Sequence, residues 1–292
     1  MLSSLRAKAA LLSVLILLVL LGIWHIATMT ATPVAAPAVQ MTPEQIEYAK
    51  LMGKDPTAGA TAAPAKSGFP TLAQMGKAIG AQLAHPFYDN GPNDKGIGLQ
   101  LAYSLGRVGL GYLIAAVVAI PLGFLIGMSP LAYRALDPFI QVLKPISPLA
   151  WMPLALYTIK DSHISGIFVI FICSVWPMLI NTAFGVAGVR REWLNVARTL
   201  EVGPLRRAFE VILPAAAPTI LTGMRISMGI AWLVIVAAEM LVGGTGIGYF
   251  VWNEWNNLSL PNVIFAILTI GVVGMLLDAM FAQLQKAVTY AD

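Results

Sequence analysis

Charged residues are scarce in this sequence. Asp, Glu, Lys and Arg make up 11% of its 292 residues, whereas a typical soluble domain carries about 25%. Hydrophobic residues make up 58% of the chain, so most side chains need an apolar environment. The composition therefore excludes an ordinary soluble globular protein and indicates a protein that is solvated by lipid.

Residue types that carry chemistry are almost as rare. Cys173 is the single cysteine, so neither a disulfide nor a cysteine pair at metal-ligand spacing can form within the chain. Its position in an apolar run predicts a buried packing residue. His25, His85 and His163 are scattered along the chain, which favours neither a metal site nor a catalytic triad. We therefore expect no catalytic residue and no bound metal.

Two further absences narrow the function. The sequence contains no Gly-x-x-x-x-Gly-Lys-Ser/Thr motif, so the chain is not expected to bind ATP through a P-loop. The net charge is +4, but no basic run is interleaved with aromatic residues, so no nucleic-acid partner is expected. The chain is predicted not to be an enzyme and to hold no cofactor of its own.

Long apolar runs dominate what the sequence does contain. A run of about 20 residues is enough to cross roughly 30 Å of hydrocarbon, and prolines and glycines inside such runs are tolerated in membrane helices. We therefore predict an all-α polytopic membrane protein with six spans. The predicted spans are residues 9–29, 105–128, 136–157, 164–186, 220–242 and 262–284.

Three parts of the chain differ in composition. Residues 1–29 are predicted to form an N-terminal transmembrane helix, although the Ala-rich stretch after it leaves cleavage open. Residues 30–98 are rich in Ala, Pro, Gly and Thr, which predicts a periplasmic linker with short helices near 42–53 and 71–84. Residues 99–287 are predicted to form the main transmembrane domain.

The distribution of arginine predicts the orientation in the membrane. Five arginines lie in residues 188–217, while 243–261 contains neither Lys nor Arg. The positive-inside rule therefore places the first segment and both termini in the cytoplasm, and the second segment outside. The glycine-rich run at 243–248 lacks a preceding strand and a ribose-binding acid, so we expect a tight turn there rather than a nucleotide loop.

The arginine-rich segment has a recognisable pattern. Its amphipathic residues are divided by Gly203-Pro204 and end at Leu213-Pro214, which predicts two short helices lying across the membrane face. The pattern resembles the cytoplasmic EAA loop of ABC-importer permeases, which reads Glu-Ala-Ala, then Gly, then Ile-x-Leu-Pro. The residues that carry this resemblance are Asn195, Val196, Ala197, Glu201, Gly203, Leu213 and Pro214.

Two positions of this loop depart from the family pattern. Asn195 stands where the family has the first Glu, and Glu201 stands at the glycine position, with Gly203 two residues further on. Because glutamate rarely adopts the left-handed conformation that glycine allows, we predict ordinary helical backbone at Glu201.

Other segments resemble the binding-protein-dependent permeases of the nitrate, sulfonate and taurine group. Residues 145–154 (PISPLAWMPL) carry the group resemblance, and 237–253 (AAEMLVGGTGIGYFVWN) is similar to nitrate, bicarbonate and cyanate permeases. The resemblance implies a type I ABC importer-like permease of the bacterial inner membrane that works by alternating access. Its implied partners are a second permease copy, cytoplasmic ATPase subunits that hold ATP and Mg, and a periplasmic substrate-binding protein.

The cargo implied by the resemblance is a small inorganic anion, nitrate or nitrite. Bicarbonate, cyanate and an alkanesulfonate or taurine remain alternatives within the same mechanism, and a heterodimer of permeases remains an alternative to a homodimer. An ion channel or a membrane scaffold is a different class of protein, and it would need no loop for docking an ATPase. An intramembrane enzyme has no supporting nucleophile, base or metal constellation.

A few charges fall in or near the predicted spans, where insertion of an ion costs roughly 2.5–3.5 kcal/mol. We take Arg107, Lys144, Arg225 and Glu239 as candidate pathway or gate residues. Arg225 and Asp278 lie near the inner ends of spans, so snorkelling to the interface is the alternative for both. Glu239 has apolar neighbours; a structural pair with a cation on another helix and a gating role both stay open for it.

Overall fold

The structure is a computed structural model that describes residues 2–29, 69–91 and 94–288. The helix predicted at 42–53 and most of the predicted linker lie outside these residues. The chain divides into two compact units. The first comprises Met1–Ala81 with Leu260–Asn262, and the second comprises Gln82–Ser259 with Val263–Asp292.

The first unit is dominated by helix α1 (Leu2–Met29). Its stretch Ala7–Thr28 has a mean hydropathy of 2.6 and exposes leucine, valine and isoleucine side chains all round, as expected of a helix that lies in lipid. At its end, the indole of Trp24 donates to the Pro70 carbonyl over 2.9 Å and packs edge-on against Phe69. The N-terminal span predicted from hydropathy is therefore helical.

Helix α3 (Leu72–Ala84) coincides with the helix predicted at 71–84. Its first turn is closed by a reciprocal capping box. The Gln74 amide donates to the Thr71 hydroxyl over 3.3 Å, and the Thr71 amide donates to the Gln74 side-chain carbonyl over 3.0 Å. This local pairing explains why a short helix forms in an otherwise loop-like composition.

A short loop precedes the helical bundle of the second unit. Asp89 and Lys95 face each other across it, and the hydrogen bond from the Lys95 ammonium holds the pKa of the Asp89 carboxyl below its usual value. Burial and a hydrogen bond with Asp94 raise the pKa of Tyr88 to about 12. These contacts fold the loop against itself directly before the first helix of the bundle.

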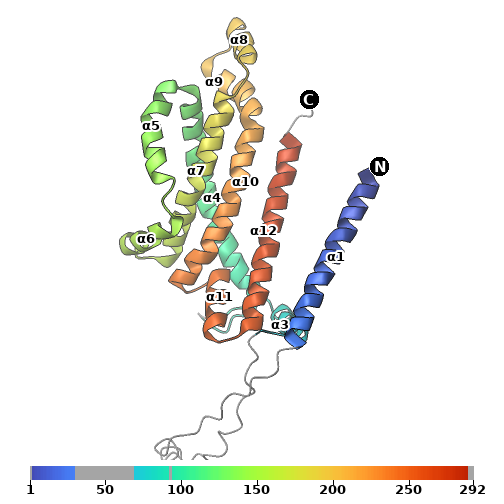
Figure 1. The fold of residues 1–292 in the computed structure, drawn as a ribbon. Helices are drawn as coiled ribbons and strands as arrows, with labels where there is room; N and C mark the ends of the chain where they lie inside the picture. The colour runs from blue at the N-terminus through green and yellow to red at the C-terminus, as the bar shows by residue number, and fades with distance from the viewer. Residues whose placement is uncertain (1, 30–68, 92–93, 289–292) are drawn as a thin grey trace, which may run out of the picture. The chain divides into compact units, whose positions relative to one another are not determined.

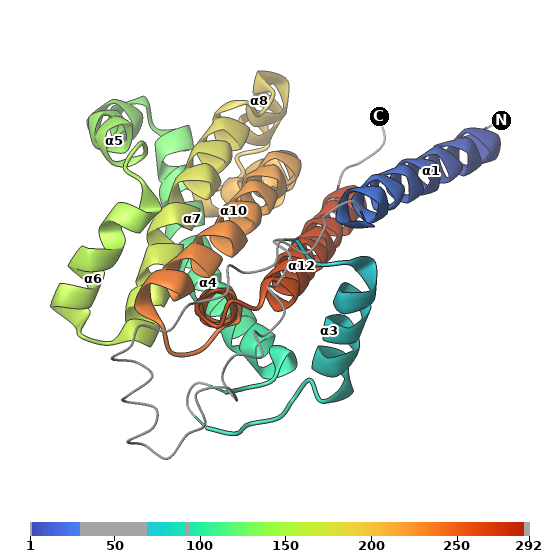
Figure 2. The same cartoon turned by 60° about the horizontal axis from the view of Figure 1, so that its bottom comes forward.

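Three long helices form the core of the second unit, and they pack side by side in Figures 1 and 2. Small residues let their backbones approach closely. A Cβ added at Gly111 would lie 2.8 Å from the Ile167 carbonyl, and one added at Gly223 would lie 2.5 Å from the Asn181 Cβ. These core helices are α4 (Ile97–Met128), α7 (Ser162–Ala187) and α10 (Leu213–Val242).

Shorter helices and one further long helix surround this core. Helix α12 lies beside α10 in Figure 1 and is joined to it by the Trp232 indole, which donates to the Ile270 carbonyl over 3.0 Å. Tyr112 of α4 also packs edge-on against Phe281. The surrounding helices are α5 (Pro130–Leu143), η1 (Pro148–Ala150), α6 (Trp151–Ile159), α11 (Ile247–Asn256) and α12 (Leu260–Val288).

The span predicted at 136–157 is not a continuous helix. Helix α5 and the segment Pro148–Ile159 meet at an angle of 78°. The chain becomes extended at Ser147 (φ −56°, ψ 129°), because Pro148 disfavours helical backbone in the residue before it. The described residues thus contain five helices able to cross a membrane, or six spans if this bent pair counts as one.

The predicted second helix of the 188–217 segment does not stop at Leu213-Pro214. Helix α9 (Pro204–Arg207), the π-helical turn η2 (Ala208–Ile212) and α10 form one helical stretch, Pro204–Val242. In the wider turn, the Leu213 amide donates to the Ala208 carbonyl five residues back. A π-turn relieves the clash that a proline ring makes in an ordinary helix, so Pro214 does not end the helix.

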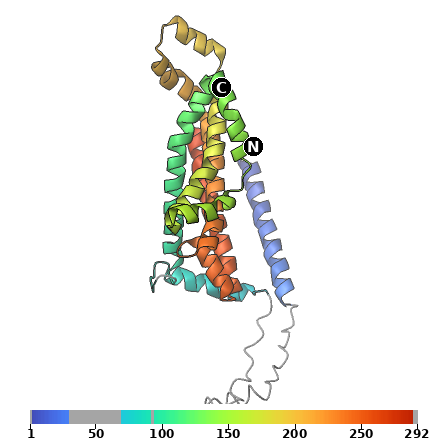
Figure 3. The ribbon, with the colours of Figure 1, turned by 90° about the vertical axis from the view of Figure 1, so that its left-hand side faces the viewer.

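Helix α8 (Arg191–Thr199) projects from one end of the second unit, as Figure 3 shows. Helix α11 lies at the opposite end. The two segments that the sequence analysis assigned to opposite sides of the membrane therefore lie at opposite ends of the bundle.

Candidate functional site

A cluster of polar side chains lies in the apolar core at the α11 end of the bundle. Arg107 is 8% exposed and Glu239 is 4% exposed, while Gln100 and Ser104 are fully enclosed. Buried charges and hydrogen-bonding groups destabilise a fold unless each one is paired. The cluster is therefore stable only if its members satisfy one another.

Arg107 and Glu239 form its central ion pair. The Arg107 Nη1 donates to the Glu239 Oε1 over 2.6 Å and joins α4 to α10. The same guanidinium donates to the Thr245 carbonyl over 2.6 Å, to the Thr245 hydroxyl over 2.7 Å and from Nε to the His163 Nδ1 over 3.1 Å. Arg107 is thus the cation on another helix that the sequence left open for Glu239. It joins α4 to α7, to α10 and to the turn that contains Thr245.

The glycine-rich run at 243–248 forms the expected turn, and it brings the first amides of α11 onto this cluster. Gly246 has φ +124°, and a Cβ there would lie 2.1 Å from the Glu239 carboxyl carbon. Glycine is therefore required both by the backbone and by the space. A carboxylate at a helix N-terminus is favoured by the helix dipole and by the free amides of the first turn.

Three amides of this turn donate into the cluster. The Gly246 amide donates to the Gln100 side chain over 2.5 Å, the Ile247 amide to the Ser104 hydroxyl over 2.9 Å and the Gly248 amide to the Glu239 Oε2 over 3.1 Å. The Ser104 hydroxyl also donates to Glu239 over 2.8 Å. The arrangement is a closed polar network that fastens α4, α7, α10 and α11 together.

Several members of this network were not predicted from the sequence. Gln100 and Ser104 precede Arg107 by seven and three residues, a spacing that places all three on one face of a helix. That polar stripe on an otherwise apolar helix was a usable signal. Thr245 and His163 had no such signal in the sequence, because they lie 138 and 56 positions away from Arg107.

The segment at the other end of the bundle exposes apolar side chains. Val196 of α8 is 59% exposed, whereas its neighbour Ala197 is 4% exposed and faces the chain itself. Asn195 is exposed as well. The further exposed apolar residues of this surface are Trp193, Leu200, Leu205 and Phe209. An apolar surface flanked by arginines in an otherwise lipid-solvated protein is typical of a docking site for another protein.

The prediction of ordinary helical backbone at Glu201 is wrong. Its φ is +52°, because α8 ends in a Schellman motif that needs a left-handed residue at this position. The Glu201 amide donates to the Arg198 carbonyl and the Val202 amide donates to the Ala197 carbonyl, both over 3.0 Å. These bonds hold the non-glycine residue there at a cost of about 1–2 kcal/mol.

Gly203 has no such requirement. Its φ of −57° is open to any residue, and an added Cβ would meet nothing within 4 Å. The left-handed position of this turn is therefore occupied by Glu201, and Gly203 precedes the first helical residue Pro204. Leu213 and Pro214 lie within the continuous helix described above.

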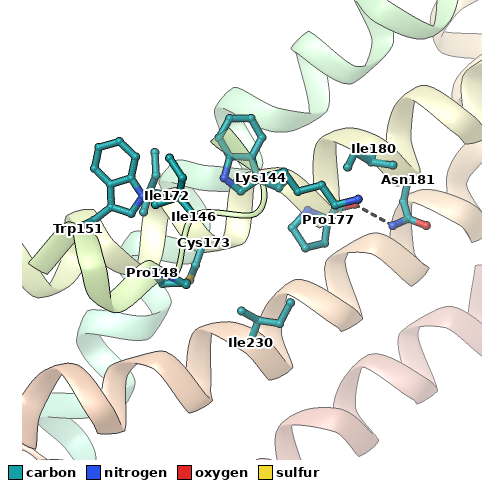
Figure 4. A pocket seen from close by; sticks show the side chains of 11 residues that line it. Lys144, Ile146, Pro148, Trp151, Ile172, Cys173, Pro177, Ile180, Asn181 and Ile230 are labelled. Atoms are coloured by element: carbon teal, nitrogen blue, oxygen red, sulfur yellow. Dashed lines mark hydrogen bonds between the residues drawn. The ribbon is translucent and has the colours of Figure 1, made fainter. Parts of the chain in front are cut away.

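The remaining two candidate residues lie elsewhere. Arg225 forms a bidentate ion pair with Asp278, with both hydrogen bonds at 2.6 Å, and links α10 to α12. Each of the two side chains is therefore paired with the other rather than snorkelling to the interface by itself. Lys144, at the end of α5, lines a cavity of about 390 Å³ between α5, α6, α7 and α10, shown in Figure 4. Of the four candidate pathway residues, the structure brings together only Arg107 and Glu239.

The chain is similar to known membrane transport proteins. Residues 119–290 match the family described as "Binding-protein-dependent transport system inner membrane component". The "Nitrate import permease protein NrtB" of Synechocystis sp. is 46% identical over 226 residues, which cover 77% of this chain and 82% of the relative. The protein of the same name from Leptolyngbya laminosa is 50% identical over 198 residues, covering 68% and 71%.

A relative with a different name is about as similar. The "Bicarbonate transport system permease protein CmpB" of Synechocystis sp. is 46% identical over 207 residues, covering 70% of this chain and 74% of the relative. Among solved structures, a chain of the inward-facing MetNI methionine ABC transporter matches with a TM-score of 0.60. That match covers 66% of this chain and 96% of the other at 13% identity, and it shows a shared fold alone.

Proposed function

Because the chain belongs to the family of binding-protein-dependent transport system inner membrane components, we propose that it carries nitrate through the membrane in an ATP-driven importer. Membership makes it a multi-pass permease subunit of an ABC importer and not an enzyme. The observation that carries the nitrate assignment is the 46–50% identity with two nitrate import permeases. Bicarbonate is the second candidate, because a bicarbonate permease is 46% identical.

The α8 segment is proposed as the contact with the ATPase subunit, which would hold ATP and Mg. Val196 is the apolar centre of its exposed surface, and arginines flank it. The positive-inside rule supports a cytoplasmic position for this segment and for both termini. The residues that form or support the docking surface are Asn195, Val196, Ala197, Glu201 and Gly203.

One continuous helix connects this contact to the outer polar network. The stretch Pro204–Val242 spans 39 residues, which is roughly 58 Å of helix, and it includes both Leu213 and Glu239. A displacement at its cytoplasmic end can therefore be carried to the outer end along one helical stretch, which includes the π-turn at Ala208–Ile212. This supports alternating access by rigid-body rocking of the helices.

We propose that the outer gate is formed by the group of helices that Arg107 and Glu239 hold together, rather than by a single side chain. Hydrogen bonds of these two residues link α4, α7, α10 and α11. The four helices therefore move together when α10 moves. A second permease copy is the proposed partner across the membrane, because none of the residues of α5 is buried within the chain. A periplasmic binding protein would deliver the anion to the α11 end.

Transport by the purified system tests this proposal. The chain would be reconstituted in liposomes with the ATPase and the binding protein of its own transport system, and uptake of [15N]nitrate, [14C]bicarbonate and taurine would be measured with and without ATP. We expect ATP-dependent accumulation of nitrate. Accumulation of bicarbonate but not nitrate would assign the second candidate, and anion flux without ATP would indicate a channel.

A further inference from the structure

Lys144 differs from the other charged residues that we took from the sequence as candidates in or near the spans. Arg107 is paired with Glu239, and Arg225 is paired with Asp278. Within residues 94–288, the Lys144 side chain has neither an ion pair nor a hydrogen bond. A cationic side chain at membrane depth costs free energy unless it meets water or an anion. An unpaired lysine at this position therefore calls for an explanation.

The backbone around Lys144 places it at the break between α5 and α6. Helix α5 ends at Leu143, and the chain turns by 78° before η1 and α6 begin. Figure 1 shows this break partway along the bundle, between the α8 end and the α11 end. Irregular backbone at membrane depth is tolerated where it is buried in protein or lines an aqueous cavity.

Two cavities adjoin at this residue. The first, of about 390 Å³, is lined by Trp151, Asn181 and nine other residues, among which Lys144 is the only charged one. The second, of about 680 Å³, lies between α5 and α7 and includes Ala187 at the end of α7 that leads to α8. Both share Lys144 and Ile180. Lys144, which is exposed, therefore lines both spaces.

The lining of the first cavity suits a simple anion. Figure 4 shows Lys144 extending toward Pro177 and Asn181. The Asn181 amide donates to the Pro177 carbonyl over 2.8 Å, and an amide nitrogen carries a second hydrogen that is available to an oxyanion. No carboxylate lines this cavity, so the ammonium group of a zwitterion would find no counter-charge in it. Arg134 and Asp137 line the second cavity instead.

We infer that Lys144 is the transient binding residue for a small monovalent oxyanion on its way through the membrane. This inference rests on the proposed function and adds the residue that the anion meets. A lysine is a point charge without the two-pronged geometry of arginine, so it attracts an anion without holding it rigidly. Conduction needs a site that is favourable enough to enter and weak enough to leave.

Charge removal at Lys144 tests the inference in the reconstituted full complex. Lys144→Gln, Lys144→Arg and the control Lys160→Gln would be compared in ATP-driven [15N]nitrate uptake. Lys160 follows α6 and lines neither cavity, so its substitution removes the same charge without changing either cavity. We expect Lys144→Gln to lower the maximal rate about tenfold, equivalent to ~1.4 kcal/mol. Lys144→Arg should retain most of the rate, and Lys160→Gln should match the wild type.

A chemical test covers the case in which Lys144→Gln fails to assemble. Lys144→Cys would be purified in a Cys173→Ala background and modified after assembly with an aminoethyl or a sulfonatoethyl thiosulfonate. Rates are compared with the Cys173→Ala chain itself. The positive adduct should restore nitrate flux, and the negative adduct should abolish it. Equal rates with both adducts, or wild-type flux in Lys144→Gln, would overturn the inference.

The two proposals fail in different ways. If the unmodified complex accumulates bicarbonate but no nitrate, the nitrate assignment is wrong. The bicarbonate uptake rates of Lys144→Gln and Lys160→Gln are then compared to test the role of Lys144. If nitrate is accumulated and Lys144→Gln equals Lys160→Gln, the proposed function stands and the role of Lys144 is wrong. Uptake of taurine equal to that of nitrate would contradict the specificity for a simple anion.

Discussion

Replacing Glu239 by glutamine removes the negative charge at the centre of the polar network at the α11 end while keeping the size of the side chain. The carboxylate of Glu239 accepts hydrogen bonds from Arg107, Ser104 and the Gly248 amide. A glutamine has one accepting oxygen and a donating NH₂ group, so the three donors can no longer all be satisfied. Arg107 is left as a buried cation without a counter-charge.

The expected loss of stability is large. Breaking a buried pair by removing one partner costs about 3–5 kcal/mol, and the exposure of Arg107 and Glu239, below 10% for each, places this pair in that class. Glu210→Gln is the matched control, because it breaks the exposed pair of Arg206 and Glu210. An exposed pair four residues apart on a helix contributes about 0.3–0.5 kcal/mol.

Thermal unfolding of the detergent-solubilised permease would measure both variants. We expect Glu239→Gln to lower the unfolding temperature by several degrees and Glu210→Gln to leave it nearly unchanged. A double variant with Arg107→Met and Glu239→Gln should recover part of the loss, because the unpaired cation is gone. Equal unfolding temperatures for Glu239→Gln and Glu210→Gln would refute the buried-pair reasoning. Wild-type transport in Glu239→Gln would separately refute the proposed gate.

Three further predictions concern the topology and the α8 segment. Cysteines introduced at Gly203 and Asn257, in a Cys173→Ala chain, should be labelled by membrane-impermeant reagents from opposite sides; labelling of both from the periplasm would contradict the orientation. Glu201→Gly should stabilise the turn after α8 by about 1 kcal/mol, because glycine has no penalty in the left-handed region; chemical denaturation that shows a loss of stability would contradict the Schellman geometry. Val196→Asp should weaken co-purification of the ATPase about tenfold without changing the unfolding temperature, since truncating a central apolar contact costs 1 kcal/mol or more; unchanged recovery would move the docking surface elsewhere.

The helical membrane fold could be predicted from the sequence, because lipid imposes a strong rule. Backbone groups in hydrocarbon must be satisfied within each span, so long apolar runs become helices whatever surrounds them. Five of the six predicted runs are long helices in the structure. The third, at 136–157, carries four prolines, and the angle at its break depends on packing rather than on hydropathy.

The partners of the buried charges were decided only by the tertiary structure. Hydropathy identifies Glu239 as a charge that is unfavourable within a span. The cation that pairs with it, Arg107, lies 132 positions away in the sequence. Glu201 shows the same limit at short range, because the bonds that close α8 overrule the residue's own preference. At Pro214, a π-turn accommodates a residue that normally ends a helix. Local propensities and hydropathy thus determine which segments span the membrane. Which charges meet depends on helix packing, because contacts between distant residues leave no local pattern in the chain.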